Sequence, residues 1–204
     1  MLNWRQKLTR FPPSRMLLRI AETSRSKSIR NLFLPFLTES QSIIDIGAGT
    51  CVLSSILQKD GFRVTALDID NFSVVDDITP RVYDGISMPF QDKTFDVAII
   101  PYVLHHTPNP DLILSEAYRV SHRVIILEDL IGSTLQTAYT YFMDSLLNFE
   151  FFGHPHTNRS FENWQKTFSN KNIIHAHPFE SKSLFSPFMK HALFVIDSAS
   201  TRTT

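Results

Sequence analysis

Residues 45–51 read DIGAGTC and lie between two apolar segments. The segment before them contains Ile43 and Ile44, and the segment after them reads VLSSIL at residues 52–57. A short apolar run, a glycine turn and an amphipathic segment are typical of a buried strand, a tight turn and a helix. Glycine lets a backbone approach a ligand closely, and the first turn of a helix has N–H groups without a helical partner. Residues 42–57 therefore predict a site for a small nucleotide-like molecule.

Strand and helix patterns alternate along the rest of the chain. Strands are predicted at residues 42–46, 62–67, 81–83, 94–100, 123–127, 172–177 and 191–197. Helices are predicted at residues 51–59, 110–120, 134–149 and 161–168. The interval from 71 to 81 is too short for a further helix with its loops. The alternation predicts an α/β domain with a Rossmann-like, doubly wound, mostly parallel seven-stranded sheet whose final strand is antiparallel.

The composition is that of one globular domain. The 204 residues are 43% hydrophobic and 20% charged, and the formal net charge is zero, which does not favour nucleic-acid binding. The one cysteine excludes an internal disulfide and suits a reducing compartment. No run reaches the roughly 20 apolar residues that span a membrane, and the start lacks a secretory pattern. We therefore expect a cytoplasmic protein.

Positive charge is concentrated in a lead-in over residues 1–40, which we expect to be partly helical and interrupted at Pro12 and Pro13. Between residues 5 and 30, eight basic residues face a single acid, Glu22. This segment could contact phosphate, anionic lipid or an acidic partner. A solvated helix face is favoured, so neither stable nucleic-acid binding nor a membrane-surface contact is expected.

Polar residues follow several predicted strands at the point where each strand ends. Ligands of parallel α/β sheets bind beside these carboxyl ends, so the side chains are expected to lie close together. An acid after the second strand, here Asp68 or Asp70, can accept both hydroxyls of a ribose. Asp84, after the third strand, can accept an exocyclic amine. The residues expected around the ligand are Asp45, Gly47, Ala48, Gly49, Asp68, Ile69, Asp84, Gly85, Ile86, Pro101 and Tyr102.

Beyond the glycine turn, residues 84–96 read DGISMPFQDKTFD. Together with DIGAGT at residues 45–50 and LDI at residues 67–69, this stretch resembles class I S-adenosylmethionine-dependent methyltransferases, in particular small bacterial members of the methyltransferase-11-like type. The resemblance is close over residues 42–129. It implies S-adenosyl-L-methionine as the cofactor and a main domain over residues 41–197 with a substrate cap within 130–170. From its terminal position, the tail at 198–204 is expected to be flexible.

The resemblance also implies roles for the residues at the strand ends. Asp45 would orient the glycine loop or meet the methionine amine, and the loop glycines would admit the cofactor chain. Asp68 would hold the ribose, and Asp84 with the Gly85–Ile86 backbone would read adenine. Cys51 stands where the family often has a third glycine, which affects cofactor binding only if its side chain faces the ligand.

The implied reaction is methyl transfer to a small organic acceptor by in-line displacement. A general base would assist if the acceptor is a hydroxyl, and histidine suits this task because its pKa lies near neutral pH. His106 is the first choice, followed by His154 or His156. The neighbouring His105 is expected to be structural.

Two other functions remain open. The chain could bind the cofactor as an inactive partner protein, or it could methylate RNA or protein with the basic lead-in as a docking arm. Methylation of nucleic-acid amines is disfavoured because Ile100 precedes Pro101 and Tyr102 where such enzymes have a polar residue. Glu128 and Asp129 could be pocket acids or caps. Histidine spacing is poor support for a metal, so none is expected, and no oligomeric state is predicted.

Overall fold

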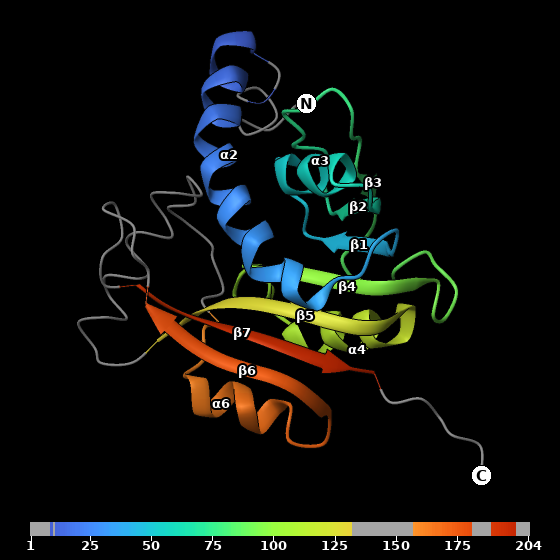
Figure 1. Ribbon diagram of the computed structural model, residues 1–204, viewed down its shortest axis with the longest axis vertical. Helices are drawn as coiled ribbons and strands as arrows, with labels where there is room; N and C mark the ends of the chain where they lie inside the picture. Colours follow the sequence, from blue (N-terminus) through green and yellow to red (C-terminus); the bar gives the residue numbers. More distant parts are fainter. Residues whose placement is uncertain (1–8, 10, 132–156, 181–188, 199–204) are drawn as a thin grey trace.

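In the computed structural model, the described residues are 9, 11–131, 157–180 and 189–198. They form one sheet with the strand order β3-β2-β1-β4-β5-β7-β6 (Figure 1). Its strands are β1 (Ser42–Ile46), β2 (Arg63–Asp68), β3 (Arg81–Val82), β4 (Phe95–Pro101), β5 (Ser121–Leu130), β6 (Asn172–Glu180) and β7 (Lys190–Asp197). Strands β1 to β5 pair in parallel, and β7 pairs antiparallel with both β5 and β6. The predicted seven-stranded, mostly parallel sheet with an antiparallel final strand is confirmed.

Helices cover both faces of this sheet. They are α2 (Pro12–Phe33), α3 (Val52–Lys59), α4 (Pro110–Val120) and α6 (Phe161–Thr167), with short 3-10 turns η1 (Leu34–Phe36) and η2 (Leu104–His106). Ile43 of β1 is buried in a cluster with side chains of α2 and α3. Its neighbour Ile44 is buried in a second cluster with side chains of α4 and α6. Because successive strand residues point to opposite faces, α2 and α3 lie on one face and α4 and α6 on the other (Figure 1).

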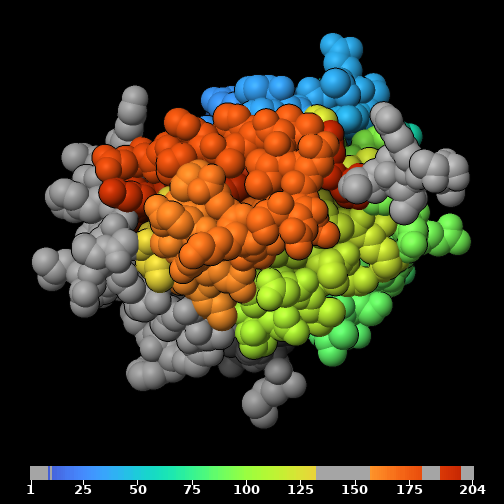
Figure 2. Space-filling model, turned by 90° about the horizontal axis from the view of Figure 1, so that it is seen from below, coloured from blue at the N-terminus to red at the C-terminus, as the bar shows by residue number. Residues whose placement is uncertain are grey.

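The central strands are apolar almost throughout because neither face is open to water. Residues Val97 to Ile100 of β4 are fully buried, and so are Val124 to Leu127 of β5. Figure 2 shows the second face from outside, where the orange atoms of α6 and β6 lie beside the yellow-green atoms of α4. The sheet is therefore doubly wound, as the sequence predicted.

Two helices begin at the caps that the sequence provides. Asn109 precedes Pro110, and its side chain accepts a hydrogen bond from the Leu112 N–H at 3.2 Å. Ser160 precedes α6, and its hydroxyl accepts a hydrogen bond from the Asn163 N–H at 3.3 Å. Such caps satisfy N–H groups that have no partner inside the helix.

The chain between β2 and β3 contains no helix over residues 69–80. Its apolar side chains Val74, Val75 and Ile78 are buried against Cys51 and Val52 at the start of α3. This loop covers the part of the sheet edge that a crossover helix would otherwise cover, as its short length led us to expect.

Pro12 and Pro13 begin α2, where proline is well tolerated because its missing N–H has no helical role in the first turn. One element boundary differs from the predictions. Strand β5 continues to Leu130 and includes Glu128 and Asp129, which the sequence placed after the strand. The continuation is held by antiparallel pairing with β7.

Several predicted features lie outside the described residues. These are the helix at residues 134–149, most of the cap within 130–170, and all but the first residue of the tail at 198–204. Within the described residues, none of the helices has the length and apolar character needed to cross a membrane.

Candidate functional site

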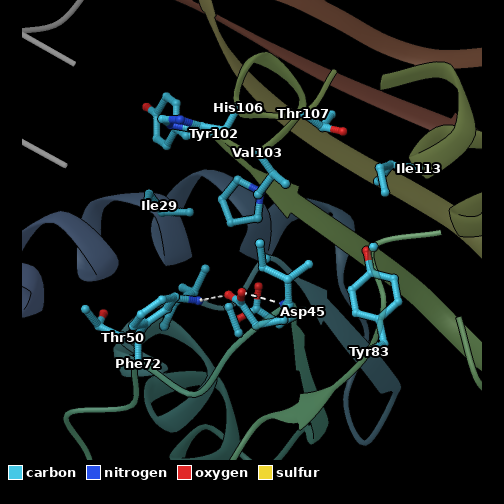
Figure 3. A pocket seen from close by; sticks show the side chains of 18 of the residues that line it. Ile29, Asp45, Thr50, Phe72, Tyr83, Tyr102, Val103, His106, Thr107 and Ile113 are labelled. Carbon is cyan, nitrogen blue, oxygen red and sulfur yellow. Dashed lines mark hydrogen bonds between the residues drawn. The ribbon is translucent and has the colours of Figure 1, made fainter. Parts of the chain in front are cut away.

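A cavity of about 790 Å³ lies at the carboxyl ends of the parallel strands. Its walls come from the loops after β1 to β4 and from one side of α2 (Figure 3). Every residue that the sequence predicted around the ligand lines it: Asp45, Gly47, Ala48, Gly49, Asp68, Ile69, Asp84, Gly85, Ile86, Pro101 and Tyr102. Asp70 is not among the lining residues, so Asp68 is the acid of that pair that faces the cavity.

The glycine loop is held by hydrogen bonds to the end of β2. The N–H groups of Gly47 and Ala48 donate to the Leu67 carbonyl at 2.8 and 3.1 Å. The N–H of Gly49 donates to Oδ2 of Asp68 at 2.7 Å. These three N–H groups are therefore hydrogen-bonded within the protein. The loop can contact a ligand through the close approach of its backbone, and not by donating these N–H groups.

Gly47 meets two steric demands at once. Its φ of +73° is in the region that L side chains rarely adopt, and a Cβ at this position would lie 2.5 Å from Cγ2 of Val103. Val103 follows β4 in the chain and lines the same cavity. The close approach of these two loops is possible only with glycine at position 47.

Asp45 is the most deeply buried carboxylate of the cavity wall, with a residue exposure of 1%. The Ser54 hydroxyl donates a hydrogen bond to its Oδ2 at 2.5 Å, whereas Oδ1 has no hydrogen-bond partner among the described residues. Burial raises the pKa of Asp45 to about 7, and the nearby charge of Asp68 acts in the same direction. The cavity wall thus contains an acceptor atom that lacks a donor.

Two further carboxylates order the loops that carry them. Asp68 accepts hydrogen bonds from the N–H of Gly49 and, through Oδ1, from the N–H of Ile69 at 2.7 Å. Asp84 accepts hydrogen bonds through Oδ1 from the N–H groups of Ile86 and Ser87, at 2.8 and 2.9 Å. These backbone donors lower the pKa of Asp84 because they favour its charged form.

Arg119 of α4 holds the segment that follows Asp84. Its guanidinium donates to the carbonyl oxygens of Met88 at 2.9 Å and Phe90 at 2.8 Å. It also pairs with Glu116, whose Oε2 accepts a hydrogen bond from the Met88 N–H at 2.7 Å. The segment after β3 is therefore fixed to α4.

The turn after β4 has an unusual backbone. Tyr102 has a φ of +57°, and its N–H donates to the Leu127 carbonyl at 2.7 Å. Its ring contacts the Arg25 guanidinium of α2, which lies 4.8 Å from the ring centroid. Burial raises the pKa of the Tyr102 hydroxyl, so it stays protonated at neutral pH. A non-glycine residue at positive φ stores strain, and such residues cluster at functional sites.

Glu128 and Asp129 are structural and neither lines the cavity. Glu128 is fully buried and accepts hydrogen bonds from the N–H groups of Val103 at 3.0 Å and Leu104 at 2.7 Å. Its other oxygen lies 2.5 Å from Nδ1 of His105. Asp129 lies 2.6 Å from Nδ1 of His191 on β7. The sequence was compatible with either pocket acids or caps. In the structure, Glu128 instead stabilises the turn after β4, and Asp129 stabilises the β5–β7 pair.

The histidines divide between packing and the cavity. His105 is fully buried, in keeping with its predicted structural role, and its ring lies 4.1 Å from that of His106. His106 lines the cavity. His154 and His156 lie outside the described residues. Within the part of the chain that is described, no three His, Cys, Asp or Glu side chains gather as a metal ion would require.

Cys51 faces away from the cavity. Its side chain is fully buried among the apolar residues between α3 and the 69–80 loop, and burial raises its pKa to about 12. It also adopts a φ of +59°, the conformation that glycine would favour at the same place. The departure from a third glycine therefore leaves the cavity wall unaltered.

Helix α2 contributes cavity residues that the sequence analysis missed. They are Leu18, Glu22, Arg25, Ser26 and Ile29. Their spacing follows one side of a helix and was available as a signal, but nothing local pairs that side with strand ends far along the chain. Phe72 and Tyr83 also line the cavity and were missed. In Figure 3, Tyr102 and His106 lie across the cavity from Thr50 and Phe72.

The same fold occurs in solved methyltransferase structures. An S-adenosylmethionine-dependent methyltransferase of Methanosarcina mazei superposes with a TM-score of 0.64 at 17% identity, covering 81% of this chain and 96% of that one. Geranyl diphosphate C-methyltransferase of Streptomyces coelicolor, in complex with Mg²⁺, geranyl diphosphate and S-adenosylhomocysteine, superposes with a TM-score of 0.63 at 13% identity, covering 89% and 84%. The fold is that of class I S-adenosylmethionine-dependent methyltransferases.

The family match agrees with the fold. Residues 44–123 match the family of methyltransferase domains. The chain is also 30% identical over 115 residues to demethylmenaquinone methyltransferase of Streptomyces griseus subsp. griseus, an alignment covering 51% of this chain and 50% of that protein. These similarities over part of the chain agree with the resemblance to S-adenosylmethionine-dependent methyltransferases that the sequence indicated. The chain spans about half the length of this curated relative.

Proposed function

We propose that the cavity binds S-adenosylmethionine and that the protein transfers its methyl group to a small organic acceptor. The observation that carries the proposal is the convergence of Asp45, Asp68 and Asp84, from three strand ends, on one cavity. An ammonium, a ribose diol and an exocyclic amine are all donors, and carboxylates are the acceptors that match them.

The surroundings of Asp45 are compatible with the amine of the cofactor. A buried acceptor without a donor is costly, and an ammonium group within reach of its Oδ1 would satisfy it. The positive charge would also favour the ionised form of a carboxyl whose pKa is raised by burial. We therefore assign the amine of the methionine part to Asp45. The loop of Gly47 and Gly49 would pass beside the cofactor chain.

The adenosine part fits the side of the cavity formed after β2 and β3. Ile69 and Ile86 line the cavity with exposures of 64% and 60%, high values for large apolar side chains. A flat base between them would remove this apolar surface from water. Asp68 would hold the ribose, because it lies on the cavity wall at the end of β2 and a carboxylate accepts hydrogen bonds from hydroxyls. Asp84 would receive the exocyclic amine.

Bound there, S-adenosylmethionine supplies an activated methyl group on a sulfonium. The residues across the cavity from Thr50 and Phe72 are then left for the acceptor (Figure 3). Tyr102 presents a protonated hydroxyl and a ring, and His106 presents an imidazole that can remove a proton from an acceptor hydroxyl. Ile29 of α2, which belongs to the same apolar cluster as Tyr102, adds apolar surface to this region.

A small acceptor agrees with the dimensions of the site. A cavity of about 790 Å³ must hold the cofactor and the acceptor together, which suits small molecules. The curated relative at 30% identity is named for methylation of demethylmenaquinone, a small-molecule acceptor. We therefore favour a small organic molecule over RNA or protein as the acceptor.

The test is transfer of labelled methyl from S-adenosylmethionine to a panel of phenols, hydroquinones, carboxylic acids and amines. Label in any extracted acceptor, lost in the Asp45→Asn variant, supports the proposal. Cofactor binding with no transfer to any member of the panel would favour the inactive-partner alternative. Transfer to RNA or protein alone would overturn the choice of acceptor.

A further inference from the structure

Helix α2 has a second side, which faces away from the cavity. The large apolar side chains Met16, Leu17 and Ile20 are 65%, 68% and 59% exposed, and Phe11 just before the helix is 62% exposed. At 3.6 residues per turn, the three helical residues fall within about 100° of arc. These four residues are called the outer apolar patch of α2. They make up half of the large hydrophobic residues that the described chain exposes.

The charges beside this patch are positive. Arg19 and Lys27 lie on exposed positions of α2, and neither forms an ion pair with any described residue. Glu22 is the single acid of the helix and lines the cavity on the other side. The sequence adds Arg5, Lys7 and Arg10 just before the patch. An exposed apolar stripe with basic neighbours is the pattern of a helix that lies in a membrane interface.

We infer that the outer apolar patch of α2 docks the protein on an anionic lipid bilayer. The apolar side chains would enter the boundary between headgroups and acyl chains, and Arg19 and Lys27 would contact lipid phosphates. Charge complementarity selects this occupant over a second copy of the chain, because two copies would bring basic surfaces together. From composition alone we favoured a solvated polar face for this helix. The large apolar side chains exposed on it differ from that expectation.

The position of the patch relates it to the cavity. Leu18, Arg25 and Ile29 of the same helix line the cavity, and the patch lies on the opposite side of α2. In Figure 1, the first turns of α2 stand at the end of the molecule away from β6 and β7. Docking through this helix would therefore place the cavity close to the bilayer, where an acceptor that partitions into lipid is concentrated.

The experiment is flotation of the full chain with vesicles of phosphatidylcholine alone and with vesicles that also contain phosphatidylglycerol. The wild type is expected to float with the anionic vesicles and to be released by high salt. The triple variant Met16→Gln, Leu17→Gln, Ile20→Gln is expected to lose about tenfold or more in vesicle affinity. The pair Arg19→Gln, Lys27→Gln should weaken binding and reduce its salt dependence.

A matched control uses exposed apolar residues elsewhere. Val82 and Ile174 are 54% and 50% exposed and do not line the cavity, so Val82→Gln with Ile174→Gln should leave flotation unchanged. Circular dichroism checks that each variant is folded. Vesicle binding needs no cofactor, so its result is independent of the proposed activity. The inference would be overturned by wild-type protein that does not float, or by a triple variant that floats as well as the wild type. It would also be overturned if the wild type formed a dimer that the triple variant abolished and the control variant did not.

Discussion

Ser54 donates a hydrogen bond of 2.5 Å to Oδ2 of Asp45, while Oδ1 of the same buried carboxylate has no partner among the described residues. The glycine loop between these two residues is thereby tied to the first turns of α3. One carboxylate oxygen is thus hydrogen-bonded to α3, and the other is a buried acceptor without a donor in the described part of the chain. We therefore expect a change at Asp45 to alter both the stability of the protein without ligand and its affinity for the cofactor.

Asp45→Asn should change the dependence of stability on pH. In the folded protein the pKa of Asp45 is raised from 3.8 to about 7, so the folded state binds a proton more tightly than the unfolded state. The wild type should therefore lose stability as pH rises from about 4 to about 7, by at most about 4 kcal/mol from this group. The Asn variant should lack this loss. Urea unfolding across that pH range measures it, and parallel curves for the two proteins would contradict the prediction.

Gly47→Ala should destabilise the protein by about 2–4 kcal/mol, because it adds backbone strain and a contact of 2.5 Å with Val103. Gly61→Ala is the matched control, since Gly61 has a φ of +96° but no atom within 4 Å of an added Cβ. It should cost about 1–2 kcal/mol from strain alone. Adding Val103→Ala should recover part of the loss at position 47. Equal costs at both glycines would rule out the steric account.

Glu128→Leu should cost about 3–5 kcal/mol, because the N–H groups of Val103 and Leu104 and the ring of His105 would lose their buried partner. Glu128→Gln keeps an acceptor oxygen and should cost less. Glu180→Gln breaks an exposed pair with Lys190 and should change stability by under about 1 kcal/mol. Thermal unfolding compares the three, and a mild effect of Glu128→Leu would contradict the bracing role.

Arg119→Gln should loosen the segment after Asp84, because the carbonyl oxygens of Met88 and Phe90 lose their donors. We expect a stability loss of about 1–3 kcal/mol and weaker binding of adenosine compounds. Arg30→Gln, which breaks a partly exposed pair with Asp60 away from the cavity, should change stability little and leave binding unchanged. Calorimetric titration with S-adenosylhomocysteine distinguishes the two variants.

His106→Ala should separate catalysis from cofactor binding. If the acceptor is a hydroxyl, loss of a general base should lower kcat by about 10²–10⁴-fold with little change in cofactor affinity. His122 is exposed and does not line the cavity, so His122→Ala should leave both quantities unchanged. An unchanged kcat in the His106 variant would remove this residue from the reaction.

The strand ends could be predicted from the sequence because topology alone brings them together. Asp45 and Asp68 lie at the carboxyl ends of β1 and β2, and Asp84 follows β3; parallel strands share one carboxyl edge. Their local patterns were sufficient to place them around one ligand. The position of the glycine loop beside the ligand could be predicted for the same reason, although its N–H groups are hydrogen-bonded within the protein.

Contacts that depend on distant pairing could not be predicted. The burial of Asp129 depends on the register that sets it opposite His191 in the β5–β7 ladder. The place of Arg25 over Tyr102 depends on how α2 crosses the sheet, which no local pattern specifies. The exposure of Leu17 beside the lining residue Leu18 likewise follows from the orientation of α2.

Calorimetric titration of the folded protein with S-adenosylhomocysteine tests the central claim most directly. We predict saturable binding at one site, weakened strongly by Asp45→Asn and more weakly at pH values below the raised pKa of Asp45, near 7, than above it. The absence of any binding heat at millimolar ligand, with circular dichroism showing a folded protein, would contradict the assignment of this cavity to the cofactor.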